Sequence, residues 1–315
     1  MANNSSTLSL WLDEVLSGWV LPVTGLVAVA VFGGLYFLGL VTEEAMATVV
    51  VLVVGIGMPL YLLRHALDAK RDPGSRALAA AAALLTLVAV LVPTLATVHP
   101  GTPLFSGELQ QVDDTLPVAG ASGNVRLLVA GQLPETGEPS VSFTLTGTTE
   151  PVEGRLQRTF SYARVGRSGR ARVAHDHTAD FYPARIPAGT SAIKLDRLQG
   201  QLASPLRVAA YSEPLPLAGG PWILALLALL VASVADARLG LKNDLSVASG
   251  MALAFGLLLT YNATPATAVG PAIGGIILGA MSGALAGWIS GAVARRFVRV
   301  AKRRPAPRPN GAAAA

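Results

Sequence analysis

Residues 268–294 read AVGPAIGGIILGAMSGALAGWISGAVA, a run without a single ionisable side chain. About 20 consecutive apolar residues cross the hydrocarbon core of a bilayer as an α-helix, so this run predicts a membrane-spanning helix. Charged residues are only 14% of the chain, whereas soluble domains average about 25%. Five further apolar runs complete a prediction of six transmembrane helices: 19–41, 45–63, 77–98, 217–235 and 245–261.

The run at 268–294 also carries glycine at every fourth position. Small residues at this spacing let the backbone of a second helix approach closely, as in a glycine zipper. We expect this glycine face to pack against the second or third apolar segment, with the alanine-rich residues 77–83 as an internal candidate. A contact between two chains is the alternative. The five residues of the glycine face are Gly275, Gly279, Gly283, Gly287 and Gly291.

Lysine and arginine in the short connections predict the orientation, because these residues are enriched on the cytoplasmic side. They occur in the connections at 64–76 and 238–242 and after residue 294, whereas the connections at 43–44 and 262–267 have none. We therefore expect a multi-pass protein of the plasma (inner) membrane. Both termini are cytoplasmic in this prediction, and residues 99–216 are extracytoplasmic. The net charge of +5 comes from these connections and the basic tail, and a basic tail beside a membrane favours anionic lipid headgroups over nucleic acid as a partner.

Residues 99–216 have a different pattern, with short alternating apolar runs separated by Gly, Pro, Asp and Ser. This pattern is typical of an all-β domain, and the number of runs favours a β-sandwich. The expected strands are 105–112, 124–130, 140–146, 154–164, 170–181, 191–198 and 206–212.

The predicted fold class is an α-helical membrane protein with an inserted extracytoplasmic all-β domain. Residues 1–98 form an interfacial helix and three transmembrane helices, and residues 99–216 form the β domain. Residues 217–294 add three more transmembrane helices. Residues 295–315 are expected to be a basic, disordered cytoplasmic tail.

The β domain contains a basic stretch with no acidic residue between positions 155 and 172. One interpretation is a solvated hairpin whose charges keep a strand edge from aggregating. The other is a docking surface for an acidic partner or for anionic lipid headgroups, since guanidinium groups pair well with carboxylate and phosphate. The six arginines concerned are Arg155, Arg158, Arg164, Arg167, Arg170 and Arg172.

His175, His177 and Asp180 form the one cluster that resembles a metal site. On an unbroken strand the two histidines share a face, but Asp180 points to the opposite face. Two imidazoles alone leave a zinc or copper ion short of ligands. The chain has no cysteine. We therefore predict no metal and no cofactor.

None of the six apolar segments has an ionisable residue in its middle, where proton relays and ion paths place one. The predicted function is a non-catalytic subunit of a membrane assembly, with membrane lipid and other membrane or extracytoplasmic proteins as partners. The alternative is a transporter or channel component for a small or lipidic solute. The sequence GIGMP at 55–59 favours that alternative, because it could kink or break a helix at a substrate site. An enzyme using His175, His177 or Asp180 is the third and least favoured class.

Overall fold

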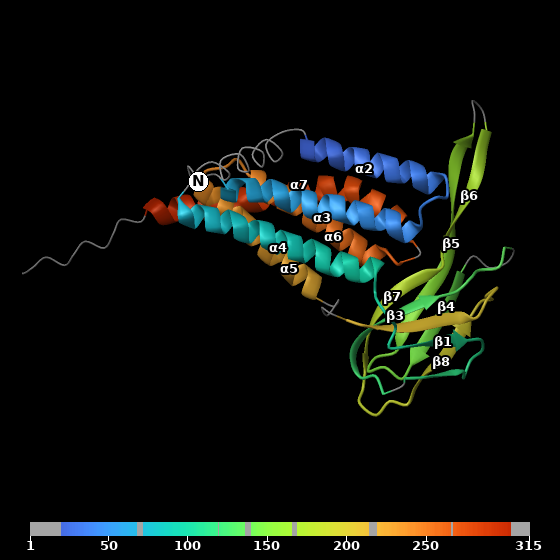
Figure 1. The fold of residues 1–315 in the computed structure, drawn as a ribbon. Coiled ribbons are helices and arrows are strands. Elements are labelled where there is room, and N and C mark those ends of the chain that lie inside the picture. The colour runs from blue at the N-terminus through green and yellow to red at the C-terminus, as the bar shows by residue number, and fades with distance from the viewer. Residues whose placement is uncertain are drawn as a thin grey trace, which may run out of the picture. The chain divides into compact units, whose positions relative to one another are not determined.

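The computed structural model describes residues 20–67, 72–118, 120–135, 140–165, 169–213, 219–265 and 267–303. The chain forms two compact units. The helical unit comprises Met1–Thr94, Trp222–Leu259 and Ala272–Ala315, and the β unit comprises Leu95–Pro221 and Thr260–Pro271. Figure 1 shows their helices and strands, most of them labelled.

Six helices account for the six apolar runs of the sequence. Five of them, α3 to α7, are long and apolar enough to cross a membrane. In the described part of α2 the apolar stretch is shorter and covers Val27–Tyr36. The helices are α2 (Val20–Phe37), α3 (Glu43–Leu67), α4 (Pro73–Val98), α5 (Gly220–Leu239), α6 (Asp244–Asn262) and α7 (Val269–Arg303).

Local sequence explains where α4 begins. Asp72 precedes the helix, and its Oδ2 accepts a hydrogen bond from the backbone N–H of Ser75 at 2.9 Å. Pro73 occupies the first helical position, where its missing N–H costs nothing. This arrangement is an N-cap followed by an N-terminal proline.

Two sequence predictions about the helices need correction. Helix α3 continues from Glu43 to Leu67 with Pro59 inside it, so residues 55–59 do not break the helix, which was one of the two possibilities for this sequence. Helix α7 continues to Arg303, so residues 295–303 are helical instead of disordered. Residues 304–315 and the predicted N-terminal interfacial helix lie outside the described residues.

The β unit contains two antiparallel sheets, in the strand orders β1-β9-β3-β7 and β2-β8-β4-β5-β6. Side chains from both sheets, including Leu127 of β3, Phe143 of β4 and Leu195 of β8, form one buried core, as in a β-sandwich. The strands are β1 (Phe105–Leu109), β2 (Thr115–Pro117), β3 (Gly123–Ala130), β4 (Ser140–Thr146), β5 (Val152–Val165), β6 (Gly169–His177), β7 (Ala179–Ile186), β8 (Ala192–Gln199) and β9 (Leu206–Ser212).

The single strand predicted over residues 170–181 is wrong. Strand β6 ends at His177 in the five-stranded sheet, and β7 begins at Ala179 in the four-stranded sheet. The chain therefore crosses between the sheets at Thr178. The prediction also missed β2, which pairs with β8 from Thr115↔Lys194 to Pro117↔Ala192.

Candidate functional site

Strand β5 extends beyond the sheet that contains it. Its pairing with β4 runs from Leu145↔Val152 to Ser140↔Gln157. Its pairing with β6 starts at Gln157↔His177 and continues to Val165↔Gly169. Within the described residues, β5 beyond Gln157 is thus paired with β6 alone. We call residues 158–165 of β5 and 169–176 of β6 the ribbon.

The structure places four of the six predicted contact arginines on the ribbon. Arg158 and Arg164 lie on β5, and Arg170 and Arg172 lie on β6. The register sets Arg164 directly opposite Arg170. Arg167 lies outside the described residues, and Arg155 precedes the ribbon.

Arg155 and Arg158 have described side chains, and each makes a local hydrogen bond. Arg155 Nη2 donates to Ser140 Oγ at 2.8 Å. Arg158 Nη1 donates to the backbone carbonyl of Pro134 at 2.7 Å and so fastens the chain that follows β3. Arg158 therefore has a structural role, which the sequence pattern did not reveal.

A groove of about 610 Å³ lies at the base of the ribbon. It starts at Gln157 and His177, which form the last pair before the ribbon, and extends over β4, β5 and β8. Basic and acidic side chains both line it, so it has no strong net charge. Its lining residues with ionisable side chains are Glu153, Arg155, His177, Asp180, Tyr182 and Arg197.

Gly154 shapes the floor of this groove. A Cβ atom at this position would lie 2.5 Å from Tyr182 Oη and would also collide with the Phe143 ring. The two rings pack edge to face at 5.6 Å. Burial raises the pKa of Tyr182 to about 12, and the nearby Asp180 carboxylate adds to this effect.

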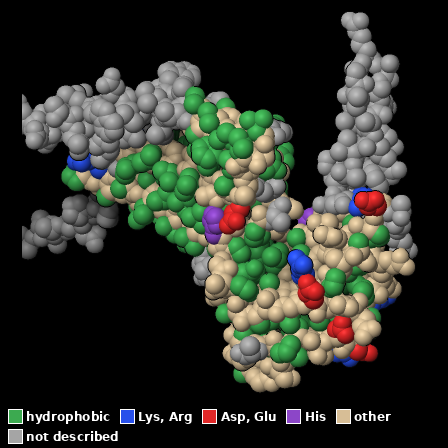
Figure 2. All heavy atoms as spheres, turned by 45° about the vertical axis from the view of Figure 1, so that its right-hand side comes forward, with side chains coloured by type: hydrophobic (Ala, Val, Ile, Leu, Met, Phe, Trp, Pro, Cys, Tyr) green, Lys and Arg blue, Asp and Glu red, His purple; other side chains and the backbone are tan. Residues whose placement is uncertain are grey.

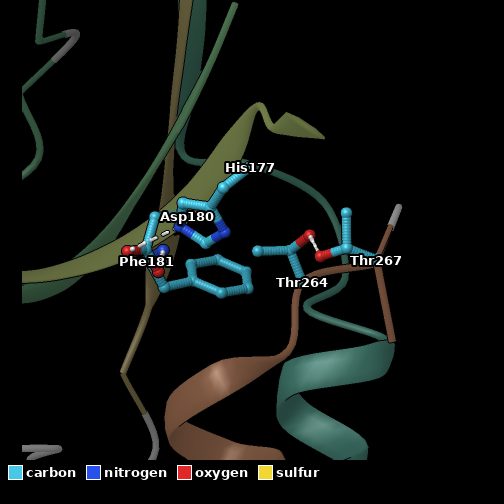
Figure 3. Close-up of polar contacts among 5 residues, drawn as sticks. All are labelled: His177, Asp180, Phe181, Thr264 and Thr267. Carbon is cyan, nitrogen blue, oxygen red and sulfur yellow. Dashed lines mark hydrogen bonds and ion pairs between the residues drawn. The ribbon is translucent and has the colours of Figure 1, made fainter. Parts of the chain in front are cut away.

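His177 and Asp180 come together because the chain crosses between the sheets at Thr178. The distance from His177 Nε2 to Asp180 Oδ2 is 3.4 Å, and Asp180 Oδ1 accepts the backbone N–H of Phe181 at 2.8 Å (Figure 3). The hydrogen bond to Asp180 raises the pKa of His177, although burial acts in the opposite direction. The expectation that Asp180 points away from the histidines, derived for an unbroken strand, is thus wrong for His177.

This pair does not complete a metal site in the described part of the chain. No group of three His, Cys, Asp or Glu side chains there is placed to hold an ion. The side chain of His175 lies outside the described residues. In Figure 3 the pair lies beside the Phe181 ring and the connection that carries Thr264 and Thr267, whose hydroxyls are 2.7 Å apart.

Arg126 is a buried cation that the sequence analysis did not identify. Its side chain is 2% exposed, and its guanidinium lies 4.9 Å from the centre of the Phe181 ring. Nη2 donates to the carbonyl of Ala96 at 2.5 Å, and Nη1 donates to Thr97 Oγ1 at 3.3 Å. Burial lowers the pKa of Arg126, and nearby Glu213 opposes this shift. Arg126 thus places its positive charge at the C-terminal end of α4, where the helix dipole favours it.

The glycine face packs within the same chain, against α6. A Cβ atom at Gly283 would collide with the backbone of Gly250 and lie 2.7 Å from Met251 Cα. One at Gly279 would lie 2.8 Å from Phe255 N. The predicted partners, the second or third apolar segment, are therefore wrong. Alanines at 79, 82 and 83 instead pack in a cluster with Ala232 and Ala235 of α5.

Asp236 near the end of α5 is fully buried and caps the first turn of α6. Its Oδ1 accepts the N–H of Leu245 at 3.0 Å, and its Oδ2 accepts the N–H and hydroxyl of Ser246 at 2.8 and 2.5 Å. The apolar run predicted at 217–235 ends just before Asp236 and assigns no role to this aspartate. The structural role of Asp236 depends on the contact between α5 and α6, which a local sequence pattern does not show.

Comparisons with protein-family models, with curated proteins and with solved structures found no significant match to this chain.

Proposed function

We propose that the protein is a non-catalytic subunit of an assembly in the plasma membrane. Six transmembrane helices, one of them formed around α2, anchor an extracytoplasmic β domain, and this domain contacts the partner. Both chain termini are cytoplasmic in this proposal.

Exposed apolar side chains on the helices support a membrane location. Leu226 of α5 is 63% exposed, and Met281 and Trp288 of α7 are 71% and 57% exposed. Soluble monomers rarely expose contiguous apolar patches of this kind. On the face that Figure 2 shows, hydrophobic side chains cover much of the helical unit. Lipid is the solvent that suits this surface.

The polar groups of the helical unit support a scaffold role. Asp236 caps α6, the Thr86 hydroxyl bonds to that of Ser249 at 2.8 Å, and Ser233 Oγ donates to Ser290 Oγ at 2.9 Å. Each of these groups is used to hold one helix against another. Substrate paths, in contrast, use intramembrane ionisable groups that face a cavity or the bundle interior.

The position of basic residues supports the orientation. Arg76 lies at the start of α4, Arg238 near the end of α5, and Arg295 and Arg296 near the end of α7. Successive crossings by α3 to α7 put all of these ends on one side, which the positive-inside rule makes cytoplasmic. The side assigned to residues 99–216 is the same whether or not α2 crosses the membrane.

The ribbon is the observation that carries the proposal of a partner. A two-stranded hairpin is at best marginally stable in water without a third strand or a packing surface. The ribbon has no described third strand, and its opposed residues Arg164 and Arg170 carry like charge, which destabilises a strand pair further. A partner that covers the ribbon would relieve both costs.

Purification from native membranes in mild detergent tests this proposal. We expect a fixed partner to co-purify with the tagged chain. The double variant Arg170→Glu with Arg172→Glu should lose most of it. A control variant, Arg185→Glu, reverses one exposed charge on β7 and should retain the partner. Recovery of the wild-type chain alone would contradict the proposal.

A further inference from the structure

Strand β6 forms one edge of the five-stranded sheet. Among the described strands its neighbour is β5, and its nine residues, Gly169–His177, contain no proline. An edge strand of this kind presents unpaired backbone N–H and C=O groups along its outer side, which is a template for another strand. Native edges of comparable length are normally covered or blocked.

Charge decides which strand this edge accepts. The described ribbon positions hold Arg158, Arg164, Arg170 and Arg172, against one acidic residue, Asp176. Pairing of two copies along this edge would bring basic strands together, and like charges on adjacent strands are destabilising. The same charges attract an acidic strand. The edge is therefore selective against a second copy of this chain.

The strand edge also favours a protein partner over a lipid surface. Phosphate headgroups neutralise arginine side chains, but they do not offer the alternating donors and acceptors that a strand edge needs. An extended peptide offers both, because its backbone pairs with the edge and its acidic side chains meet the arginines. Backbone and charge together therefore favour a peptide.

We propose that the outer edge of β6, Gly169–His177, binds an acidic extended segment of the partner protein, which adds as a further strand to the sheet β2-β8-β4-β5-β6. This inference rests on the proposed function, since it names the chemistry of the partner surface. It gives the basic residues of the ribbon a role beyond protecting an edge.

Binding of a synthetic strand to the full chain tests the inference. The chain is held in nanodiscs of neutral lipid, and the probe is a nine-residue peptide that alternates glutamate with valine. A lysine–valine peptide is the matched control. We expect the acidic peptide to bind and to slow amide hydrogen exchange over Gly169–His177. Equal binding of both peptides, or binding without slower exchange in β6, would overturn strand addition.

Arginine variants connect this binding to the ribbon. Arg170→Glu with Arg172→Glu should weaken the acidic peptide about tenfold, because two attractive charges become repulsive. Arg170→Gln with Arg172→Gln should have an intermediate effect, and it guards against loss of folding in the first variant. The control variant Arg185→Glu should bind as the wild type does. Equal weakening by the control variant would overturn a specific role for β6.

Three further outcomes separate the competing accounts. If vesicles containing phosphatidylglycerol bind in an Arg170- and Arg172-dependent manner and the acidic peptide does not, the surface recognises lipid and the inference fails. If the native partner co-purifies with the double variant Arg170→Glu with Arg172→Glu as well as it does with the wild type, the inference fails while the proposed function stands. If no partner co-purifies with the wild type, the proposed function itself fails.

Discussion

The helical unit and the β unit differ in which apolar side chains they expose and in how many small residues they bury. Many buried positions in the helices are small, as at Ala79, Ala232 and Ala235, while large apolar side chains such as Met281 and Trp288 face outward. The β unit follows the usual pattern of a water-soluble domain, with large side chains such as Phe143, Leu145 and Leu195 buried.

This difference reflects two solvents. In water, burial of large apolar side chains supplies the main driving force for folding. In lipid, that driving force is lost, and close backbone packing and interhelical hydrogen bonds take over. The contact between Gly283 and Gly250 belongs to the second kind, and the packing of Phe143 on Tyr182 belongs to the first.

The two units nevertheless treat buried charge in the same way. Asp236 lies at the amino end of α6, and Arg126 lies at the carboxyl end of α4. Each side chain has the sign that a helix dipole favours at that end, and each pairs with backbone groups that the helix leaves unsatisfied. Both buried charges are thus explained by helix termini.

The largest effect is expected from a side chain on the glycine face. Gly283→Leu should prevent α7 from approaching α6 and cost about 3 kcal/mol or more, because a rigid backbone lies opposite. Gly274→Leu is the control, since nothing lies within 4 Å of a Cβ atom there. Folded yield in detergent should fall sharply for the first variant only. Normal yield of Gly283→Leu would contradict backbone packing of α7 on α6.

A smaller effect is expected from removal of the buried cap. Asp236→Ala should cost about 2 kcal/mol, because three donors at Leu245 and Ser246 lose their acceptor. Asp244→Ala removes an exposed acidic residue from the same first turn and should cost only a few tenths of a kcal/mol. Thermal unfolding of both variants in the same detergent makes the comparison, and equal melting temperatures would refute the cap.

A side chain added at a glycine of the β unit should cost less stability than one added on the glycine face of α7. Gly154→Ala places a methyl group against the Tyr182 hydroxyl and the Phe143 ring, which are side-chain atoms that have some freedom to move. We expect a loss of about 1–3 kcal/mol. Amide hydrogen exchange in β4 and β5 should become faster, while exchange in the helices stays unchanged. Unchanged exchange in β4 and β5 would show that this contact is loose.

The smallest effect concerns His177 and pH. Because the pKa of His177 is raised in the folded state, its stabilisation is fully present below its ordinary value of 6.5. That stabilisation is lost as pH rises through the raised value. The pair is partly exposed, so the difference should stay below about 1 kcal/mol. Between pH 5.5 and 8 the wild type should lose slightly more stability than His177→Gln. A larger loss of stability in His177→Gln than in the wild type would contradict a raised pKa of His177 in the folded state.

Local patterns predicted the helices and several strands well. The run at 245–261 corresponds to α6 within one residue at each end, and the predicted strands 140–146 and 206–212 coincide with β4 and β9. These elements depend on hydrophobic periodicity, which is a local property. The break between β6 and β7 was missed because nothing in the residues around Thr178 interrupts the pattern.

Side-chain partners could not be predicted in the same way. Arg126 is one polar residue between the buried residues Val125 and Leu127, so its sequence context resembles any half-exposed strand. Its burial depends on Phe181 and Ala96, which are distant in sequence. The glycine face predicted close helix packing but contained no information about which helix would approach. Such pairings are properties of the tertiary fold.

Cysteine labelling tests the central claim, that lipid surrounds the helices and the β unit lies outside the cytoplasm. The chain has no native cysteine, so single residues can be introduced at exposed positions. With a membrane-impermeant maleimide added to intact cells, Glu150→Cys should be labelled, and Lys242→Cys should be labelled only after the cells are opened. The reverse pattern, or recovery of the intact chain from the soluble fraction without detergent, would contradict the account.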